Sequence, residues 1–500
     1  MPVRICVPLV QHSPDEMLKA AHEARRGGAD LLEYRLDAIK PAPRVEHVAY
    51  LLRRTPLPAV ITCRLKEQGG MADLPRELRL SILLEALHLS AAYVDIEWPD
   101  ETILHRKRGG SKSRIIASFH DFKGVPKNLS AQLDRMEKGP ADVVKAAVTP
   151  ASATESSALL ELLKEGEKPR IVIGMGLPGV PTRVIGPLYG AEFTFAALDT
   201  DKGSAPGQPV LDGMLNLYRV RNITGSTSIL GVLGNPLGHS LSPLLHNTVF
   251  RELSMDAVYL PFEVKGDPAE FVEEWAALHG LHGASVTIPH KIGVMAACLG
   301  LDDSARKIGA ANTLYSLPGG GYRGANTDAP AVTDALSDAL GGKPLKGKKV
   351  LVLGAGGAAR AAVYGLVTAG CRVVIANRTH EKAVSLAKTF GAQTVKWEDR
   401  TSADADILVN MTSSGMHPHV DEIPIDPSYI EKDMVVFDAV YNPLTTRLLA
   451  AAKERGATMV TGIEMFLRQA AHQLQLWFGI EKPPLELMRR TLLEALGEKH

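Results

Sequence analysis

Eight short apolar runs in the first 200 residues constrain the fold of this chain more than any other feature. Most neighbouring runs are separated by enough sequence for a helix, such as residues 77–91. Repeated strand–helix units on this scale predict an α/β fold, a parallel (β/α)8 barrel, with an open doubly wound sheet as the alternative. The runs are ICVPLV (5–10), DLLEYR (30–35), AVITCR (59–64), YVDIEW (93–98), RIIASF (114–119), DVVKAAV (142–148), RIVIGM (170–175) and AEFTFAAL (191–198).

The charge balance and the hydrophobic pattern limit the partners that we expect. The 500 residues contain 56 Lys plus Arg and 56 Asp plus Glu, which gives no reason to expect nucleic acid or an anionic membrane as a partner. No uncharged apolar run approaches the length of a membrane span, and strand-like sequence near the first residue leaves no room for a signal peptide. The four isolated cysteines fit a reducing compartment. We therefore expect a cytoplasmic protein that binds small molecules.

Polar side chains stand at the carboxyl ends of these runs, where a barrel enzyme carries its chemistry. Lys145 lies inside an apolar run; burial favours its neutral amine, which can attack a ketone, although a lysine paired with a carboxylate is the alternative. His120 can move a proton or serve as a structural hydrogen-bonding residue, and the arginines suit a substrate carboxylate or salt bridges. The combination predicts an enzyme that forms a Schiff base with a small keto acid. The positions are Glu33, Arg35, Arg64, His120, Lys145, Arg183 and the segment 204–208.

The first half resembles the type I 3-dehydroquinate dehydratases. The resemblance rests on LLEYRLD (31–37), TCR (62–64), SFHDF (118–122), ADVVKAAVTP (141–150) and SAPGQ (204–208). It implies that Lys145 forms an imine with the substrate ketone without an external cofactor. His120 would then take the acidified proton and return it to the leaving hydroxyl. The residues implied to hold the substrate are Glu33, Arg35, Arg64 and Arg183, with Ser204 and Gln208 on a loop that closes over it.

One position departs from that family. The family usually carries a glutamate just before the Gly-Gly pair that follows its TxR strand, and this chain has Gln68 there, next to Glu67. A carboxylate would orient and charge the histidine, whereas an amide can only orient it. We therefore predict that the first activity is retained and that His120 titrates at lower pH than is usual for the family.

A glycine-rich turn in the second half predicts a dinucleotide site. After a stretch rich in Gly, Ser and Thr at 222–228, the segment 348–366 supplies a β-branched strand, the turn and a helix, which is the context that a Rossmann phosphate site requires. The next strand ends in Asn377 and Arg378, where an NAD site would carry an acid, and a cation there favours the 2′-phosphate of NADP. The expected cofactor contacts are Gly354, Ala355, Gly356, Gly357, Ala358, Asn377, Arg378, Thr379, Lys382 and Thr412.

Three polar segments precede this nucleotide unit: GHSLSP (238–243), ASVTIPHK (284–291) and the stretch from IGAANTL to GANTDAP (308–330). Each segment alone fits ordinary capping and turn chemistry. Together they supply hydroxyls, an amide, and a Lys291/Asp328 pair that can donate the proton needed by a ketone that receives hydride. This interpretation requires that Lys291 and Asp328 meet in the fold.

The second half resembles shikimate dehydrogenase through these segments and through NMTSSGM (410–416), DAVYNPLTT (438–446) and TGIEMFLRQAAHQ (461–473). The resemblance implies that Lys291 and Asp328 are the acid–base pair and that NADPH delivers hydride to 3-dehydroshikimate. The implied substrate contacts are Ser240, Ser242, Thr287, Asn312, Tyr441 and Gln469. The implied domains are a dehydratase barrel at 1–222, a substrate domain at 226–340 joined by terminal helices at 464–500, and an NADP-binding Rossmann domain at 345–463.

Together the two resemblances imply successive reactions of the shikimate pathway on one chain, from 3-dehydroquinate through 3-dehydroshikimate to shikimate. Oxidation of quinate by the second half is one alternative, and a metabolite sensor derived from these domains is another. We expect no metal ion, because the histidines lack ligand spacing, and no nucleic acid or membrane partner. The expected assembly is a monomer or a homodimer.

Overall fold

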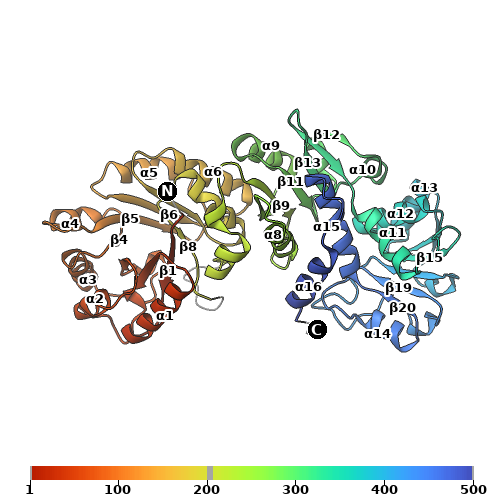
Figure 1. The fold of residues 1–500 in the computed structure, drawn as a ribbon, viewed down its shortest axis with the longest axis horizontal. Helices are drawn as coiled ribbons and strands as arrows, with labels where there is room; N and C mark the ends of the chain where they lie inside the picture. Colours follow the sequence, from red (N-terminus) through yellow and green to blue (C-terminus); the bar gives the residue numbers. More distant parts are fainter. Residues whose placement is uncertain (1–2, 200–206, 498–500) are drawn as a thin grey trace. The chain divides into compact units, whose positions relative to one another are not determined.

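A computed structural model of the chain describes residues 3–199 and 207–497 (Figure 1). By packing, the chain divides into two compact units. Unit 1 contains residues 1–243 and 254–281, and unit 2 contains residues 244–253 and 282–500. In the described part, no helix is both long enough and apolar enough to cross a membrane.

Unit 1 is built around a parallel barrel. Its strands follow the order β7-β6-β5-β4-β3-β2-β1-β8, and a parallel bridge between Arg170 and Ala191 joins the two ends of this order. The arrangement confirms the (β/α)8 barrel that the spacing of the apolar runs predicts. The strands are β1 (Ile5–Leu9), β2 (Leu31–Arg35), β3 (Ala59–Thr62), β4 (Tyr93–Glu97), β5 (Arg114–Asp121), β6 (Val143–Val148), β7 (Arg170–Gly174) and β8 (Thr194–Phe195).

Helices follow the strands and cover the outside of the barrel (Figure 1). Because one side of each strand faces these helices and the other faces the barrel interior, strands such as β1 and β2 are buried along their whole length. Cys6, Leu31 and Val60 belong to the apolar interior cluster. The helices are α1 (Pro14–Arg26), α2 (Val45–Leu52), α3 (Arg76–His88), α4 (Glu101–Arg106), α5 (Leu129–Glu137), α6 (Ala153–Lys164) and α7 (Val180–Ile185).

The rest of unit 1 packs against the barrel helices. Parallel strands β9 (Ser228–Gly234) and β10 (Ala257–Glu263) precede α9 (Pro268–His279), which contacts α6, while β10 contacts α7. The His279 imidazole lies 2.8 Å from the hydroxyls of both Ser157 and Tyr189. Specific polar contacts therefore fix this segment on the barrel.

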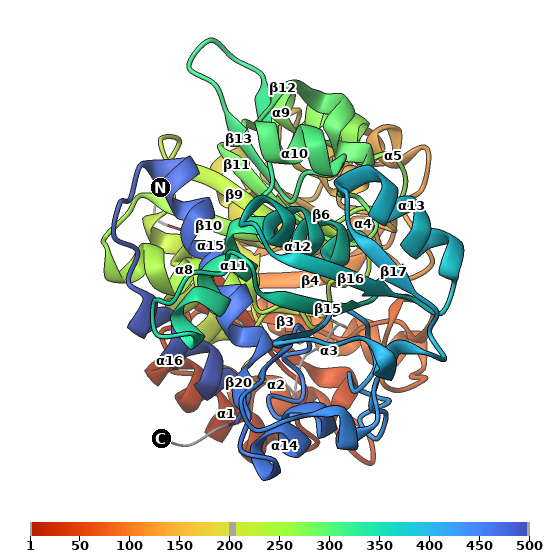
Figure 2. The same cartoon turned by 90° about the vertical axis from the view of Figure 1, so that its right-hand side faces the viewer.

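Unit 2 contains a parallel sheet of the order β17-β16-β15-β18-β19-β20. Figure 2 labels β15, β16, β17 and β20 of this sheet. This order, which reverses between β15 and β18, is that of a Rossmann fold and confirms the prediction made from the glycine turn. Since side chains alternate along a strand, Val350 packs with α11, α12 and α13, and Leu351 packs with α14. The strands are β15 (Lys349–Leu353), β16 (Arg372–Ala376), β17 (Gln393–Val395), β18 (Ile407–Asn410), β19 (Val435–Asp438) and β20 (Thr458–Val460).

A second, mixed set of strands in unit 2 carries the polar segments that precede the Rossmann sheet. Strand β13 (Thr313–Ser316) pairs antiparallel with β11 (Gly283–Val286) and β14 (Tyr322–Ala325), and β12 (Cys298–Leu301) pairs parallel with β14. The helices are α8 (Ser242–Glu252), whose first two residues belong to unit 1, α10 (Asp303–Ile308), α11 (Asp328–Ala339), α12 (Gly357–Thr368), α13 (His380–Phe390), α14 (Arg447–Glu454), α15 (Gly462–Phe478) and α16 (Leu485–Ala495).

Two candidate active sites

The polar residues of the first site form a layer above the apolar interior of the barrel. Because side chains alternate along a strand, Leu31 and Glu33 share one side of β2, and Val143 and Lys145 share one side of β6. The first residue of each pair belongs to the apolar cluster, and the second lines a cavity. The predicted residues that line this cavity are Glu33, Arg35, Arg64, His120, Lys145, Arg183 and Gln208. Ser204 lies outside the described residues.

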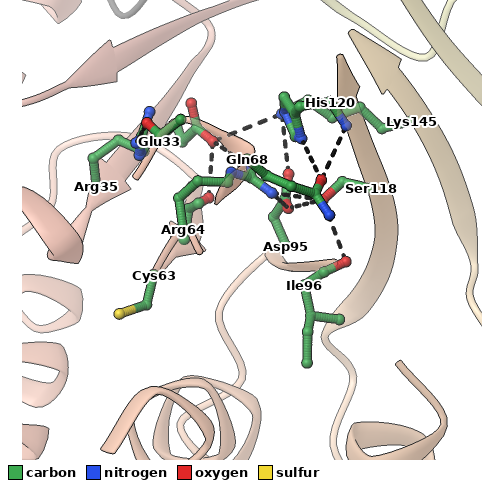
Figure 3. A network of polar contacts seen from close by, with 12 residues as sticks. Glu33, Arg35, Cys63, Arg64, Gln68, Asp95, Ile96, Ser118, His120 and Lys145 are labelled. Atoms are coloured by element: carbon green, nitrogen blue, oxygen red, sulfur yellow. Dashed lines mark hydrogen bonds and ion pairs between the residues drawn. The ribbon is translucent and has the colours of Figure 1, made fainter. Parts of the chain in front are cut away.

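Lys145 is buried, and it is also paired with carboxylates. Its Nζ donates to Asp95 Oδ2 at 3.0 Å and lies 3.8 Å from Glu33 Oε1 (Figure 3). The same nitrogen lies 4.6 Å from the centre of the Phe195 ring. A positive charge on this nitrogen, in an ammonium or in an imine, is therefore stabilised from two directions.

Asp95 belongs to this site, although no role was expected for it from the sequence. Besides Lys145, it accepts a hydrogen bond from Ser118 Oγ at 2.7 Å and lies 2.9 Å from Arg64 Nη1. Burial raises the pKa of Asp95, but the charges of Arg64 and Lys145 outweigh burial and hold that pKa well below its usual range. The available signal was the pair of acids, Asp95 and Glu97, inside the apolar run 93–98.

Two of the predicted substrate-binding arginines have carboxylate partners within the protein. Arg35 donates to both oxygens of Asp37, at 3.0 Å and 2.8 Å. Arg64, which lines the cavity, donates to Ser118 Oγ at 2.6 Å (Figure 3). It also donates to Glu97 Oε1 at 3.2 Å. Their guanidinium groups are oriented before any ligand arrives.

Arg183 differs from these two arginines. It is buried, and its Nε has no hydrogen-bond partner among the described residues, while Nη1 donates to the Phe195 carbonyl at 3.5 Å. Burial lowers the pKa of Arg183 to about 10. Since a buried cation without an anion is costly, Arg183 is the arginine best suited to receive a ligand carboxylate.

His120 is oriented by the glutamine that departs from the family pattern. Gln68 Oε1 accepts a hydrogen bond from the His120 backbone N–H at 3.0 Å and lies 3.3 Å from the ring Nδ1 (Figure 3). Burial, followed by the charges of Arg64 and Lys145, lowers the pKa of His120 well below its usual range. The imidazole is therefore neutral at physiological pH and able to accept a proton.

The second site contains the lysine and aspartate that had to meet. Lys291 Nζ donates to Asp328 Oδ2 at 2.5 Å, and Asn312 Nδ2 donates to Asp328 Oδ1 at 2.8 Å. The three residues come from the segment after β11, the segment before β13 and the first position of α11. Asp328 thus orients the ammonium while the amide fixes the other carboxylate oxygen.

The predicted hydroxyl contacts fall in different places. Thr287 is half-buried directly after β11, four residues before Lys291. Ser240 and Ser242 belong to unit 1, where Ser240 Oγ accepts from the Ser242 backbone N–H at 3.4 Å. The Ser240 hydroxyl therefore accepts from the first backbone N–H of α8, which is the ordinary capping role that the sequence left open for these serines.

Tyr441 and Gln469 both approach Phe466 on α15. The Tyr441 ring stacks on the Phe466 ring with centroids 5.5 Å apart, and burial raises the pKa of Tyr441. Gln469 Nε2 donates to the Phe466 carbonyl at 3.1 Å, within its own helix. A further glutamine, Gln473, is buried and accepts from Ser285 Oγ at 2.9 Å, which ties α15 to β11.

The glycine turn has the geometry that a pyrophosphate requires. Gly354 has φ +112°, and a Cβ there would lie 3.0 Å from the Met411 carbonyl, so position 354 favours glycine. Gly356 precedes α12 without a side-chain cap, which leaves backbone N–H groups for a phosphate. Ala355 and Ala358 complete the turn with small side chains.

The expected contacts to the adenosine side of the cofactor follow β16. Asn377 Nδ2 donates to the Thr379 carbonyl at 2.8 Å, and Arg378, Thr379 and Lys382 are exposed around the start of α13. Exposed cations at this position fit a 2′-phosphate.

Throughout 3–199 and 207–497, no group of three His, Cys, Asp or Glu residues could hold a metal ion.

Four family models match the chain in succession. They are type I 3-dehydroquinase at residues 5–224, shikimate dehydrogenase substrate binding domain at 232–314, shikimate/quinate 5-dehydrogenase at 337–438, and shikimate 5′-dehydrogenase C-terminal domain at 462–493.

One relative matches almost the whole chain, and others match its second half. The chloroplastic bifunctional 3-dehydroquinate dehydratase/shikimate dehydrogenase of Arabidopsis thaliana is 35% identical over 502 residues, covering 96% of this chain and 83% of the relative. The NADP(+) shikimate dehydrogenase of Methanosarcina mazei is 40% identical, covering 54% of this chain and 98% of the relative. A crystal structure of shikimate 5-dehydrogenase from Thermus thermophilus with NADP(H) and shikimate is 34% identical with a TM-score of 0.50, covering 54% of this chain and 100% of that structure.

Proposed function

The chain belongs to the family of bifunctional 3-dehydroquinate dehydratases/shikimate dehydrogenases, and on this premise we propose which of its residues perform the two reactions. In the shikimate pathway, the chain dehydrates 3-dehydroquinate to 3-dehydroshikimate and reduces that product to shikimate with NADP as cofactor. Lys145 and His120 carry the first reaction, and Lys291 and Asp328 carry the second. The supporting observation is that Lys145 and His120 line one cavity, where Lys145 Nζ donates to Asp95 Oδ2 at 3.0 Å.

In the dehydration, Lys145 gives up a proton and attacks the substrate ketone as the free amine. The proton is returned as the carbonyl oxygen leaves as water, which gives a protonated imine. The protonated imine withdraws electrons from the neighbouring carbon, and His120 takes a proton from that carbon. His120 returns the proton to the leaving hydroxyl, and water then hydrolyses the imine. Asp95 stabilises the positive charge throughout, and Arg183 holds the substrate carboxylate. No external cofactor or metal ion takes part in this proposal.

In the reduction, Lys291 donates a proton to the ketone oxygen while the ketone carbon is reduced. Asp328 orients the ammonium, and Asn312 fixes Asp328. When bound, NADPH supplies the hydride. The glycine turn at 354–357 and Thr412 hold the cofactor, and Arg378 with Lys382 receives its 2′-phosphate. The substrate contacts are Ser240, Ser242, Thr287, Asn312, Tyr441 and Gln469.

The domain limits also stay part of the proposal: 1–222 for the dehydratase, 226–340 with 464–500 for the substrate domain, and 345–463 for the NADP-binding domain. We further propose a monomer or homodimer in the cytoplasm. The relative from Arabidopsis thaliana is named as chloroplastic, so fractionation of the source cells is the test of location.

The experiment that tests the residue assignment uses both activities of one protein. After addition of 3-dehydroquinate, enone absorbance rises, and later addition of NADPH is followed by its consumption. We expect Lys145→Ala to abolish the first stage and retain reduction of supplied 3-dehydroshikimate, with the converse result for Lys291→Ala. Borohydride reduction during turnover should attach the substrate to the wild-type chain but not to Lys145→Ala. A borohydride adduct on another lysine would refute the imine assignment.

Quinate remains a second substrate to test, because one matching family model describes shikimate/quinate 5-dehydrogenases. Comparing kcat/KM for shikimate and quinate oxidation decides between them. We expect shikimate to be strongly preferred.

A further inference from the structure

Asp438 is a buried aspartate that neither proposed reaction uses. It is the last residue of β19 and is 0% exposed. In the parallel register it stands beside Asn410, the last residue of β18, which in turn stands beside Leu353 at the end of β15. In a sheet of this order, dinucleotides bind at the carboxyl ends of these strands. Asp438 therefore lies at the level of the cofactor site.

Three hydrogen-bond donors surround the Asp438 carboxylate. Oδ1 accepts from Asn410 Nδ2 at 2.9 Å and from the Val440 backbone N–H at 3.1 Å, and Oδ2 accepts from Thr446 Oγ1 at 2.6 Å. Burial raises the pKa of Asp438 to about 6, whereas these bonds act in the opposite direction. None of the three donors is a cation, so the fold holds a costly buried charge through neutral groups alone.

One branch of this network leads to Thr412. Asn410 Oδ1 accepts from the Thr412 backbone N–H at 3.0 Å and from Thr412 Oγ1 at 2.7 Å. Thr412 also lies against the glycine turn, since a Cβ on Gly354 would be 3.3 Å from its methyl group. The Asp438–Asn410 bond therefore sets the place of Thr412 beside the turn.

The other branch leads to Tyr441. The Val440 N–H bond to Asp438 fixes the backbone immediately before Tyr441. A second bond, from the His417 N–H to the Asn442 carbonyl at 3.1 Å, joins this segment to the loop after β18. One carboxylate thus links a predicted cofactor contact to a predicted substrate contact.

We propose that Asp438 is a positioning residue for the dehydrogenase reaction, which holds Thr412 and Tyr441 in their working arrangement before NADPH binds. The inference rests on the proposed roles of Thr412 and Tyr441. Asp438 positions Thr412 through Asn410, and it positions Tyr441 through the Val440 backbone.

The test compares Asp438→Ala and Asp438→Asn in the full chain. In Asp438→Asn, the side-chain oxygen still accepts from Asn410 and Val440, and the new amide can donate to Thr446. The matched control is Asp433→Ala, which removes an exposed carboxylate near the opposite end of β19. The measurements are NADPH affinity by fluorescence titration, hydrogen exchange without cofactor, and dehydratase kcat/KM as an internal control.

We expect Asp438→Ala to weaken NADPH binding about tenfold and to speed exchange at 410–416 and 439–446, because buried donors lose their acceptor. Asp438→Asn should stay within about threefold of wild type, since it keeps most of these bonds. Dehydratase kcat/KM should not change in any variant. NADPH affinity and exchange that match Asp433→Ala would overturn the proposal, as would an Asn variant as weak as the Ala variant.

If Asp438→Ala loses protection throughout unit 2, Asn410→Ala replaces it. That variant leaves Asp438 two donors and removes the bonds that Asn410 makes to Thr412 and to the Ser414 carbonyl. It should weaken NADPH binding and speed exchange at 412–414, and unchanged values would overturn the proposal. Thr412→Ala distinguishes failure of the proposed cofactor role of Thr412 from failure of the positioning role of Asp438. An unchanged NADPH affinity in Thr412→Ala refutes the cofactor role of Thr412, whereas a weakened affinity there with a normal Asp438→Ala refutes positioning alone.

Discussion

Lys145 within β6, Asp95 within β4 and Arg64 just after β3 form a chain of opposite charges. All three are buried, so their interactions are screened by solvent far less than those of surface pairs. Burial, followed by the charges of Arg64 and Lys145, lowers the pKa of the neighbouring His120. At the scale of the residue, the arrangement keeps the acid ionised and the histidine neutral, which is what an imine mechanism with a histidine base requires.

Gln68→Glu tests this electrostatic arrangement. Gln68 Oε1 lies 3.3 Å from His120 Nδ1, so a carboxylate at this position should raise the pKa of His120 because it stabilises the imidazolium. The base works only when neutral, so the acid limb of the dehydratase kcat/KM profile should move to higher pH in the variant. The control is Glu67→Gln, which changes an exposed neighbour. A pH–rate profile unchanged by Gln68→Glu would contradict this explanation.

Arg378→Asp tests the choice of cofactor. A carboxylate repels the 2′-phosphate of NADPH but can accept hydrogen bonds from the ribose hydroxyls of NADH. We expect KM for NADPH to rise about tenfold or more, with a much smaller change for NADH. Lys388→Asp, which makes the same charge change near the other end of α13, is the control. Equal effects on the two cofactors would refute the assignment.

At the scale of the element, the carboxyl end of α9 holds this helix on the barrel. His279, its last residue, lies within hydrogen-bond distance of Ser157 on α6 and of Tyr189, and its ring also meets Trp275 at a centroid distance of 4.7 Å. Burial lowers the pKa of His279 to about 4. The neutral ring can donate from one nitrogen and accept at the other, which suits two hydroxyl partners.

His279→Ala should loosen α9 from the barrel. We expect the local free energy of opening, measured by hydrogen exchange across 268–279, to fall by about 1–3 kcal/mol, because the buried Ser157 hydroxyl and the half-buried Tyr189 hydroxyl lose a partner. Since the folded pKa of about 4 lies below the ordinary 6.5, the unfolded state binds more protons between these values. The wild-type contribution is thus complete above pH 6.5 and is lost as pH falls toward 4. His88→Ala, at the exposed end of α3, should leave exchange across 268–279 unchanged.

At the scale of the whole molecule, one chain carries two sets of reactive groups that share no residue. The Lys145 cavity lies in unit 1, and the Lys291–Asp328 pair lies in unit 2. The product of the first reaction is the substrate of the second, and it is a small molecule that can diffuse between chains. Physical linkage raises its local concentration but is not required for the chemistry.

A mixture of Lys145→Ala and Lys291→Ala chains tests this independence. Given 3-dehydroquinate and NADPH, the mixture should consume NADPH after a lag and then reach the steady rate of a matched amount of wild type. The lag arises because the intermediate must build up in solution. A mixture that stays far below the wild-type rate would show that transfer within one chain is required.

The sequence by itself determined the fold class and predicted most of the proposed reactive groups. The spacing of the apolar runs specifies strand–helix repeats, since period and length are local properties of the chain. The glycine turn specifies a Rossmann unit for the same reason. Lys145 and His120 could be proposed because a polar residue within an apolar strand, or near its end, interrupts a local pattern.

Only the tertiary structure decided which groups meet. Asp95 is 50 residues from Lys145, and Asp438 is 28 residues from Asn410, yet each pair forms a hydrogen bond. Such pairing depends on the register of neighbouring parallel strands and on closure of the barrel, which no short stretch of sequence encodes. The roles proposed for Asp95 and Asp438 could therefore be inferred only from the folded chain, because the function of a carboxylate depends on the groups that surround it.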